Sequence, residues 1–198
     1  MKKKQTIDTQ LVDRAIIFAT KAHASAVRKG SSLPYIVHPL EAMAIVATIT
    51  SDQELMAAAL LHDVVENTDF SLDDIRREFG NRVADLVDAE TSREIEGVSH
   101  VDSWRMRKQA TIDELAKASR DVQIVALGDK LSNMRAMAFN YRQYGDRVWE
   151  RFNEKNPASH AWYYNQLAIS LAPLSDTDAY QEFVSLVKQV FSTFEACP

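Results

Sequence analysis

The sequence predicts an all-α fold of about eight to ten helices. Apolar residues recur at helical spacing along almost the whole chain, beginning with Leu11, Ala15, Phe18 and Ala22 on one face. Helix start signals recur as well, and no segment shows the alternation of a convincing strand. With 198 residues, 46% of them hydrophobic and 26% charged, we expect residues 1–198 to form one compact domain with a buried core.

The first helices are marked by their caps. Asp8 is the expected N-cap of the first helix, and the second helix is expected to start after Pro39. Ser51 and Ser71 each begin a capping-box pattern, with an acidic residue three positions later. The helix that follows Ser71 is short and is expected to end near Gly80.

The later helices follow from the same periodicity. We expect helices at about 82–90, 103–118, 121–139, 145–153, 157–172 and 176–195. Asn156 and Pro157 are a typical cap and first helical residue, whereas residues 122–127 are apolar and partly β-branched but continue into helical spacing without a turn. Most ligand contacts are expected in the loops around 27–37, 92–102 and 140–146.

Charge and cysteine content exclude several classes of protein. The 23 basic and 28 acidic residues give a net charge of −5, which argues against a general nucleic-acid binder. No export signal and no run of about 18 apolar residues is visible, so we expect neither secretion nor a membrane partner. The single cysteine, Cys197, cannot form an internal disulfide, which favours the cytoplasm.

Two histidines and two aspartates stand in unusual settings. His38 precedes a proline, His62 and Asp63 end an alanine-rich helix, and Asp129 interrupts an apolar helix. A buried carboxylate requires a partner, and two imidazoles with two carboxylates can share one divalent cation such as Mn²⁺ or Fe²⁺. The His-Asp doublet alone could arise by chance. Asp129 could also pair with the adjacent Lys130, although neighbouring helical residues point about 100° apart.

Glu66 extends this set. It follows His62 by four residues and Asp63 by three, so the three side chains share roughly one helical face. A nearby carboxylate can orient a water molecule that a divalent cation activates, or accept its proton. The pattern therefore indicates metal-assisted hydrolysis.

Four motifs in order resemble a known family. They are RKG at 28–30, PYIVHP at 34–39, LHDVVENT at 61–68 and GDKLSN at 128–133. Together they look like the HD-superfamily alarmone hydrolases, that is, the hydrolase domains of Rel/Spo-type proteins and the stand-alone small alarmone hydrolases. The similarity runs from about residue 8 to residue 172.

The resemblance implies an HD-type helical fold and a specific reaction. It implies removal of the 3′-pyrophosphate from guanosine 3′,5′-bis(diphosphate) or its pentaphosphate, which yields GDP or GTP and pyrophosphate. A single Mn²⁺ would be held by His38, His62, Asp63 and Asp129. The substrate would be bound by Arg28 beside the base, Lys29 near phosphate, Asn133 near the ribose, and Tyr163. Apart from the resemblance, we expect the basic residues Lys108 and Lys130 to contact the substrate as well.

Several of these positions have plainer interpretations. Arg28 and Lys29 could belong to a solvated loop, and Lys108 with Arg105 could form a solvent face instead of the mouth of a site. Large aromatic residues in helices usually serve in packing, although one of them could touch substrate. This applies to Trp149, Trp162, Tyr163 and Tyr164.

Several positions depart from the family pattern. Thr91, Ser92 and Arg93 replace the usual acidic-Asp-Lys run, and Ala136 stands where a hydroxyl or carboxylate is common. Asn67 stands where alarmone hydrolases usually carry Asp; an amide can position water but cannot accept its proton near neutral pH, so Glu66 is left as the base. Gly128 replaces a usual alanine and is expected to cost roughly 1 kcal/mol of helix stability.

Alternative functions follow from the departures at Asn67, Arg93 and Ala136. The chain could hydrolyse another nucleotide, such as an adenosine alarmone, or could be a catalytically weak nucleotide-binding module. The apolar face of the last helix either completes the core or forms a dimer interface, so the oligomeric state is undetermined at this point.

Overall fold

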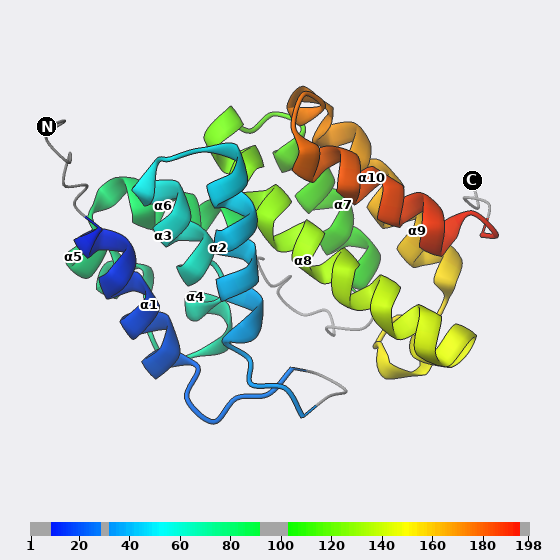
Figure 1. Ribbon diagram of the computed structural model, residues 1–198, viewed down its shortest axis with the longest axis horizontal. Coiled ribbons are helices and arrows are strands. Elements are labelled where there is room, and N and C mark those ends of the chain that lie inside the picture. Colours follow the sequence, from blue (N-terminus) through cyan, green and yellow to red (C-terminus); the bar gives the residue numbers. More distant parts are fainter. Residues whose placement is uncertain (1–8, 29–31, 92–102, 195–198) are drawn as a thin grey trace, which may run out of the picture.

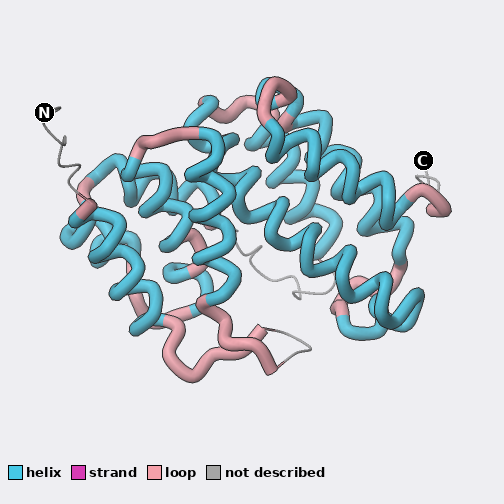
Figure 2. Tube along the Cα trace, viewed as in Figure 1, coloured by secondary structure: helices cyan, strands magenta, loops and turns pink. Residues whose placement is uncertain are grey.

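The computed structural model describes residues 9–28, 32–91 and 103–194, and it confirms the all-α prediction. These residues form helices joined by turns and loops, with one isolated bridge between Val27 and Pro34 as their only β-type pairing (Figure 2). The α-helices are α1 (Gln10–Ala22), α2 (Val37–Ile49), α3 (Gln53–Leu61), α4 (Val64–Asn67), α5 (Leu72–Phe79), α6 (Asn81–Glu90), α7 (Trp104–Leu115), α8 (Arg120–Tyr144), α9 (Pro157–Ser170) and α10 (Asp178–Phe191). Two 3₁₀ helices, η1 (Gly145–Arg151) and η2 (Ala172–Leu174), complete the order.

The long helix α8 is the centre of the molecule. It crosses between α1 to α6 on one side and α7, α9 and α10 on the other (Figure 1), and it packs against α2, α3, α6 and α10. Gly128 permits the close approach of α2, because a Cβ atom there would lie 2.8 Å from the Ala42 carbonyl oxygen and 2.9 Å from Val46 Cγ2. The glycine that the sequence marks as a helix weakener therefore has a packing role.

Two of the four predicted caps are found. Ser71 forms the complete capping box with Asp74, and Asn156 caps α9 by accepting a hydrogen bond from the Ala158 amide. The prediction for Ser51 is wrong: Asp52 is the N-cap of α3, because its carboxylate accepts from the Glu54 amide. The expected cap Asp8 and the loop 92–102 lie outside the described residues.

Two helix boundaries differ from expectation. Helix α2 begins at Val37, so Pro39 lies in its first turn, where the backbone amide that proline lacks has no intrahelical partner. Helix α8 continues to Tyr144 and absorbs most of the loop expected at 140–146. The helix expected at 145–153 is the 3₁₀ helix η1.

The core lies where the helices meet α8. Leu55, Leu60, Leu127 and Leu131 are essentially inaccessible to solvent, and Phe183 of α10 is fully buried with them. The apolar face of α10 therefore completes the core. Among the described residues, no helix combines the length and apolar character needed to cross a membrane.

Candidate active site

Three helices bring two histidines and an aspartate together. His38 lies in the first turn of α2, His62 ends α3 and Asp129 lies midway along α8; they are 3%, 4% and 7% exposed. One nitrogen or oxygen atom from each residue lies within 4.8 Å of the others. Asp129 Oδ1 is 3.1 Å from His38 Nε2 and 3.6 Å from His62 Nε2.

Asp63 faces the same point. It follows His62 directly and is the N-cap residue of α4. Its Oδ2 atom is 3.1 Å from His62 Nε2 and 3.5 Å from His38 Nε2. All four residues that the resemblance implied as ligands are thus clustered.

Hydrogen bonds to the Nδ1 atoms of His38 and His62 fix the orientation of the two imidazole rings. His62 Nδ1 lies 2.8 Å from the Ala59 carbonyl oxygen, so it must carry the proton. His38 Nδ1 lies 2.8 Å from Ser132 Oγ, whose own proton is donated to Glu41 Oε2 at 2.8 Å, so His38 Nδ1 is also a donor. Nδ1 is thus the donor toward the protein on both rings, and Nε2 is the atom that each imidazole turns toward the two carboxylates.

This arrangement fits a divalent cation. His62 Nε2 is buried and has no hydrogen-bond partner within the described residues. Burial lowers the pKa of His62, but Asp63 and Asp129 outweigh burial and raise that pKa well above its ordinary value, so the site favours added positive charge. Mixed imidazole and carboxylate donors suit a divalent transition metal, and hydrogen-bonded imidazoles are typical of metal ligands.

Helix α4 brings Glu66 and Asn67 to the surface beside the cluster. Both side chains are exposed. Asn67 Nδ2 donates to Tyr35 Oη at 3.2 Å, and Tyr35 Oη donates to Asp63 Oδ2 at 2.6 Å. Burial and the charge of Asp63 raise the pKa of Tyr35 far above its usual value, so the phenol remains a donor. The sequence pattern predicts no role for Tyr35, although this residue lies only three positions before His38.

Lys130 lies between two buried carboxylates. Its Nζ atom is 2.5 Å from Asp129 Oδ2 and 3.3 Å from Glu90 Oε2. The pairing of Asp129 with Lys130 therefore coexists with the histidine cluster, because the two carboxylate oxygens face opposite ways. Glu90 was missed from sequence, since a glutamate at the end of an amphipathic helix carries no signal of burial.

A chain of hydrogen bonds connects Arg28 to the cluster. One guanidinium nitrogen of Arg28 donates to Asn133 Oδ1 at 2.9 Å, and Asn133 Nδ2 donates to Asp129 Oδ1 at 2.6 Å. The guanidinium carbon lies 5.8 Å from the centre of the Tyr35 ring. The structure thus brings Arg28 and Asn133 to the site, whereas Lys29 lies outside the described residues.

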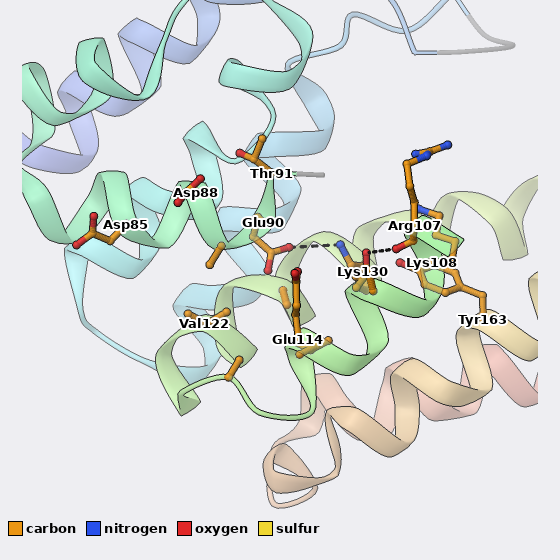
Figure 3. A pocket seen from close by; sticks show the side chains of 16 residues that line it. Asp85, Asp88, Glu90, Thr91, Arg107, Lys108, Glu114, Val122, Lys130 and Tyr163 are labelled. Atoms are coloured by element: carbon orange, nitrogen blue, oxygen red, sulfur yellow. Dashed lines mark hydrogen bonds and ion pairs between the residues drawn. The ribbon is translucent and has the colours of Figure 1, made fainter. Parts of the chain in front are cut away.

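A cavity of about 540 Å³ lies beside the cluster, between α6, α7 and α8 (Figure 3). Asp85 and Asp88 lie toward one end of it, and Lys108 and Tyr163 toward the other. Lys108 Nζ sits 4.7 Å from the Tyr163 ring centre and makes no hydrogen bond or ion pair with any described residue. Burial, assisted by the charge of Lys130, lowers the pKa of Lys108 to about 8. One end of the cavity therefore offers an amine that has no ion-pair partner among the described residues.

The other aromatic candidates serve mainly in packing. Trp149 is buried and stacks on His160 and Phe191, and Tyr164 stacks on Phe191. The Arg105 guanidinium carbon lies 3.5 Å from the Trp162 ring centre. Among the aromatic residues singled out in the sequence, Tyr163 is the one that lines the cavity.

The chain is similar in sequence to proteins that carry two different enzyme names. A GTP pyrophosphokinase of Streptomyces coelicolor is 31% identical over 198 residues, which is 94% of this chain and 22% of that protein. A guanosine-3′,5′-bis(diphosphate) 3′-pyrophosphohydrolase of Haemophilus influenzae is 36% identical over 129 residues, 61% of this chain and 18% of that protein. The chain thus spans about a fifth of the length of these curated relatives.

Solved structures show the same fold. A metazoan ortholog of SpoT, described as hydrolysing ppGpp, superposes with a TM-score of 0.70 at 23% identity, covering 97% of this chain and 99% of that one. The protein lmo0812 of Listeria monocytogenes superposes with a TM-score of 0.69 at 29% identity, covering 78% of this chain and 99% of that one. The HD domain family matches residues 15–155, which include the whole histidine and aspartate cluster. The chain therefore belongs to the HD domain family.

Proposed function

We propose that this protein is a metal-dependent hydrolase that removes the 3′-pyrophosphate from guanosine 3′,5′-bis(diphosphate), yielding GDP and pyrophosphate, and acts likewise on the pentaphosphate to yield GTP. The convergence of His38, His62, Asp63 and Asp129 on one point is the observation that carries the proposal. The name of the Haemophilus influenzae relative supports this substrate. Because that substrate is an intracellular nucleotide, we also propose a cytoplasmic location.

We propose Mn²⁺ as the cation, held by these four residues. A bound divalent cation lowers the pKa of water and stabilises the charge that develops on phosphate oxygens. The protein contributes the geometry: Ser132 and Ala59 hold the imidazoles in the tautomer that a metal requires. Lys130 holds the second oxygen of Asp129 and so restricts the rotation of that carboxylate.

We assign the remaining groups by their chemistry and position. Glu66 is an exposed carboxylate beside the cluster and acts as the base that accepts the proton of the attacking water, while Asn67 helps to position that water. Lys108 and Lys29 bind phosphate, and Lys130, which also lines the cavity, contacts the substrate while paired with Asp129 and Glu90.

The nucleoside is bound on the other side of the cluster. Arg28 presents a guanidinium plane that can stack on the base, and Asn133 lies next to it for the ribose. Tyr163 lies beneath Lys108 and completes the wall of the cavity. Substitutions at Arg28 should therefore affect KM more than kcat.

The decisive experiment is pyrophosphate release from guanosine 3′,5′-bis(diphosphate) by the purified protein with Mn²⁺, with the nucleotide products followed in the same reaction. We expect GDP and pyrophosphate in equal amounts. Turnover should disappear with a chelator and in His62→Ala. A folded, Mn²⁺-loaded protein that leaves this nucleotide intact would contradict the proposal.

Asn67 favours one second candidate, hydrolysis of another nucleotide. An amide at this position changes the polar groups beside the metal cluster relative to the usual carboxylate. A parallel assay with adenosine 3′,5′-bis(diphosphate) and with nucleoside triphosphates distinguishes the two substrates. A catalytically weak binding module would bind these nucleotides without turnover.

A further inference from the structure

The hydroxyl group of Tyr35 lies between Asp63 and Asn67, in a position that no role assigned above explains. We propose that Tyr35 is a positioning residue that holds the Asp63 carboxylate toward the metal cluster, and that Asn67 directs the single phenolic proton to Asp63. This inference rests on the proposed divalent-cation site but not on the identity of the substrate.

The Tyr35 ring is held in place from several sides. It lies against the His23 ring, with the ring centres 4.8 Å apart, and the Arg28 guanidinium carbon is 5.8 Å from its centre. Its backbone amide donates to the Ala26 carbonyl oxygen at 2.9 Å. A ring held in this way presents its hydroxyl to Asp63 with little freedom to turn elsewhere.

The direction of each hydrogen bond follows from counting protons. A phenol carries one proton, and the distance of 2.6 Å to Asp63 Oδ2 assigns that proton to the carboxylate, which can only accept. Tyr35 Oη must then accept from its other neighbour. Asn67 meets this need because its amide Nδ2 donates to Oη at 3.2 Å.

An aspartate at position 67 would create a conflict. The carboxylates of residues 63 and 67 would then compete for the one phenolic proton of Tyr35. The carboxylate without that proton would face the lone pairs of Tyr35 Oη, which is repulsive. With asparagine, Asp63 is the only carboxylate that competes for the Tyr35 proton among its described hydrogen-bond neighbours. The departure of Asn67 from the family pattern therefore has a specific structural consequence.

The hydrogen bond acts on the carboxylate oxygen that faces the cluster. Asp63 Oδ2, which accepts from Tyr35, is the same atom that lies 3.1 Å from His62 Nε2 and 3.5 Å from His38 Nε2. Loss of the phenolic donor would free the carboxylate to rotate, because Asp63 is the least buried of the four clustered residues, with a side chain 17% exposed. Metal affinity should therefore depend on Tyr35.

The test is a double-mutant cycle read out by Mn²⁺ binding. The dissociation constant for Mn²⁺ alone is measured by isothermal titration calorimetry for the metal-free protein of residues 1–198 and for its Tyr35→Phe, Asn67→Asp and double variants. We expect Tyr35→Phe to weaken binding by about 10- to 100-fold, as for other groups that orient a metal ligand. Asn67→Asp changes the Mn²⁺ dissociation constant by some factor in each background. With Tyr35 present, we expect that factor to be shifted toward weaker binding by at least about threefold relative to the Tyr35→Phe background.

Two control variants separate positioning from folding. Tyr180→Phe removes a hydroxyl that donates to the Ala168 carbonyl oxygen at 2.9 Å away from the cluster, and it should leave Mn²⁺ binding unchanged. Asn67→Ala removes the amide donor without adding a competing acceptor, so it should change Mn²⁺ affinity less than Asn67→Asp does. The comparison of Asn67→Ala with Asn67→Asp does not require the Tyr35→Phe variant. It therefore tests the inference even if Tyr35→Phe does not fold, and thermal unfolding in EDTA shows whether that variant folds.

Three results would overturn the inference. They are a folded Tyr35→Phe variant that binds Mn²⁺ within twofold of the wild type, an Asn67→Asp effect that is the same in both backgrounds, and a wild-type protein that binds no Mn²⁺. Alarmone turnover by the wild type is measured separately. The assay can therefore contradict the proposed substrate while the binding data support the coupling of Tyr35, Asn67 and Asp63. Equally, the binding data can contradict the coupling while the assay supports the substrate.

Discussion

Glu66 is the one exposed carboxylate that α4 places beside the buried cluster, and its neighbour Asn67 cannot accept a proton. We therefore expect Glu66→Gln to lower kcat by about 10² to 10⁴, the range for loss of a general base, while Mn²⁺ affinity stays close to that of the wild type. Steady-state kinetics and calorimetry check the two parts. Glu150→Gln, an exposed glutamate on η1, is the matched control and should retain full activity.

Lys108 makes the proposed reaction sensitive to alkaline pH. Because burial lowers its pKa to about 8, the side chain is charged below that pH and neutral above it. We expect kcat/KM, which reports the free enzyme, to fall about tenfold as the pH rises through 8. A pH profile from 6.5 to 9.5 measures this, and Lys108→Arg should move the fall to higher pH since arginine keeps its charge. An unchanged midpoint in Lys108→Met would assign the fall to another group.

The clustering of the histidine and aspartate side chains could be predicted from the sequence, but the groups around them could not. His38, His62 and Asp129 stand out in the sequence because each is a polar residue in an apolar setting. Tyr35 and Glu90 are ordinary in composition and position, and their importance arises from contacts with residues 28 and 40 positions away. Such contacts depend on how helices pack, which periodicity does not specify.

Helix packing predicts a further effect at Gly128. An added methyl group would press on the Ala42 carbonyl oxygen and on Val46, so we expect Gly128→Ala to lower the free energy of unfolding by about 1–3 kcal/mol, despite the better helix propensity of alanine. Urea unfolding measures the change. Mn²⁺ affinity should also fall, because separation of α2 from α8 moves His38 away from Asp129. A variant more stable than the wild type would show that the helices adjust freely.

Helix identity was predictable where local chemistry decides it. The capping box of Ser71 and the Asn156–Pro157 start of α9 depend only on neighbouring residues, and both are present. The start of α2 and the end of α8 were misjudged. Helix α2 begins before Pro39 because the first turn of a helix tolerates proline. Helix α8 continues beyond its clearest periodicity because its C-terminal part packs against other elements, α10 and η1 among them.

Metal removal should affect the stability of the whole molecule. A ligand that binds only the folded state at 100 times its dissociation constant adds about 2.7 kcal/mol, which for a chain of this size corresponds to roughly 5–10 °C in Tm. We expect EDTA to lower Tm by about this amount and Mn²⁺ to restore it, as measured by scanning fluorimetry. His62→Ala should show no response to either. An equal response in that variant would place the stabilising ion elsewhere.

The clustered side chains come from positions 38, 62, 63 and 129, which are contributed by the first third of the chain and by a helix that begins only at Arg120. During synthesis from the N-terminus, the α2 and α3 ligands emerge from the ribosome long before Asp129 does. The nascent chain therefore holds an incomplete set of donors while the residues between His38 and Asp129 are added. Under the proposed metal site, capture of the ion with full affinity would report that α8 has docked, and the cation would act as a non-covalent crosslink that closes the longest of these loops last.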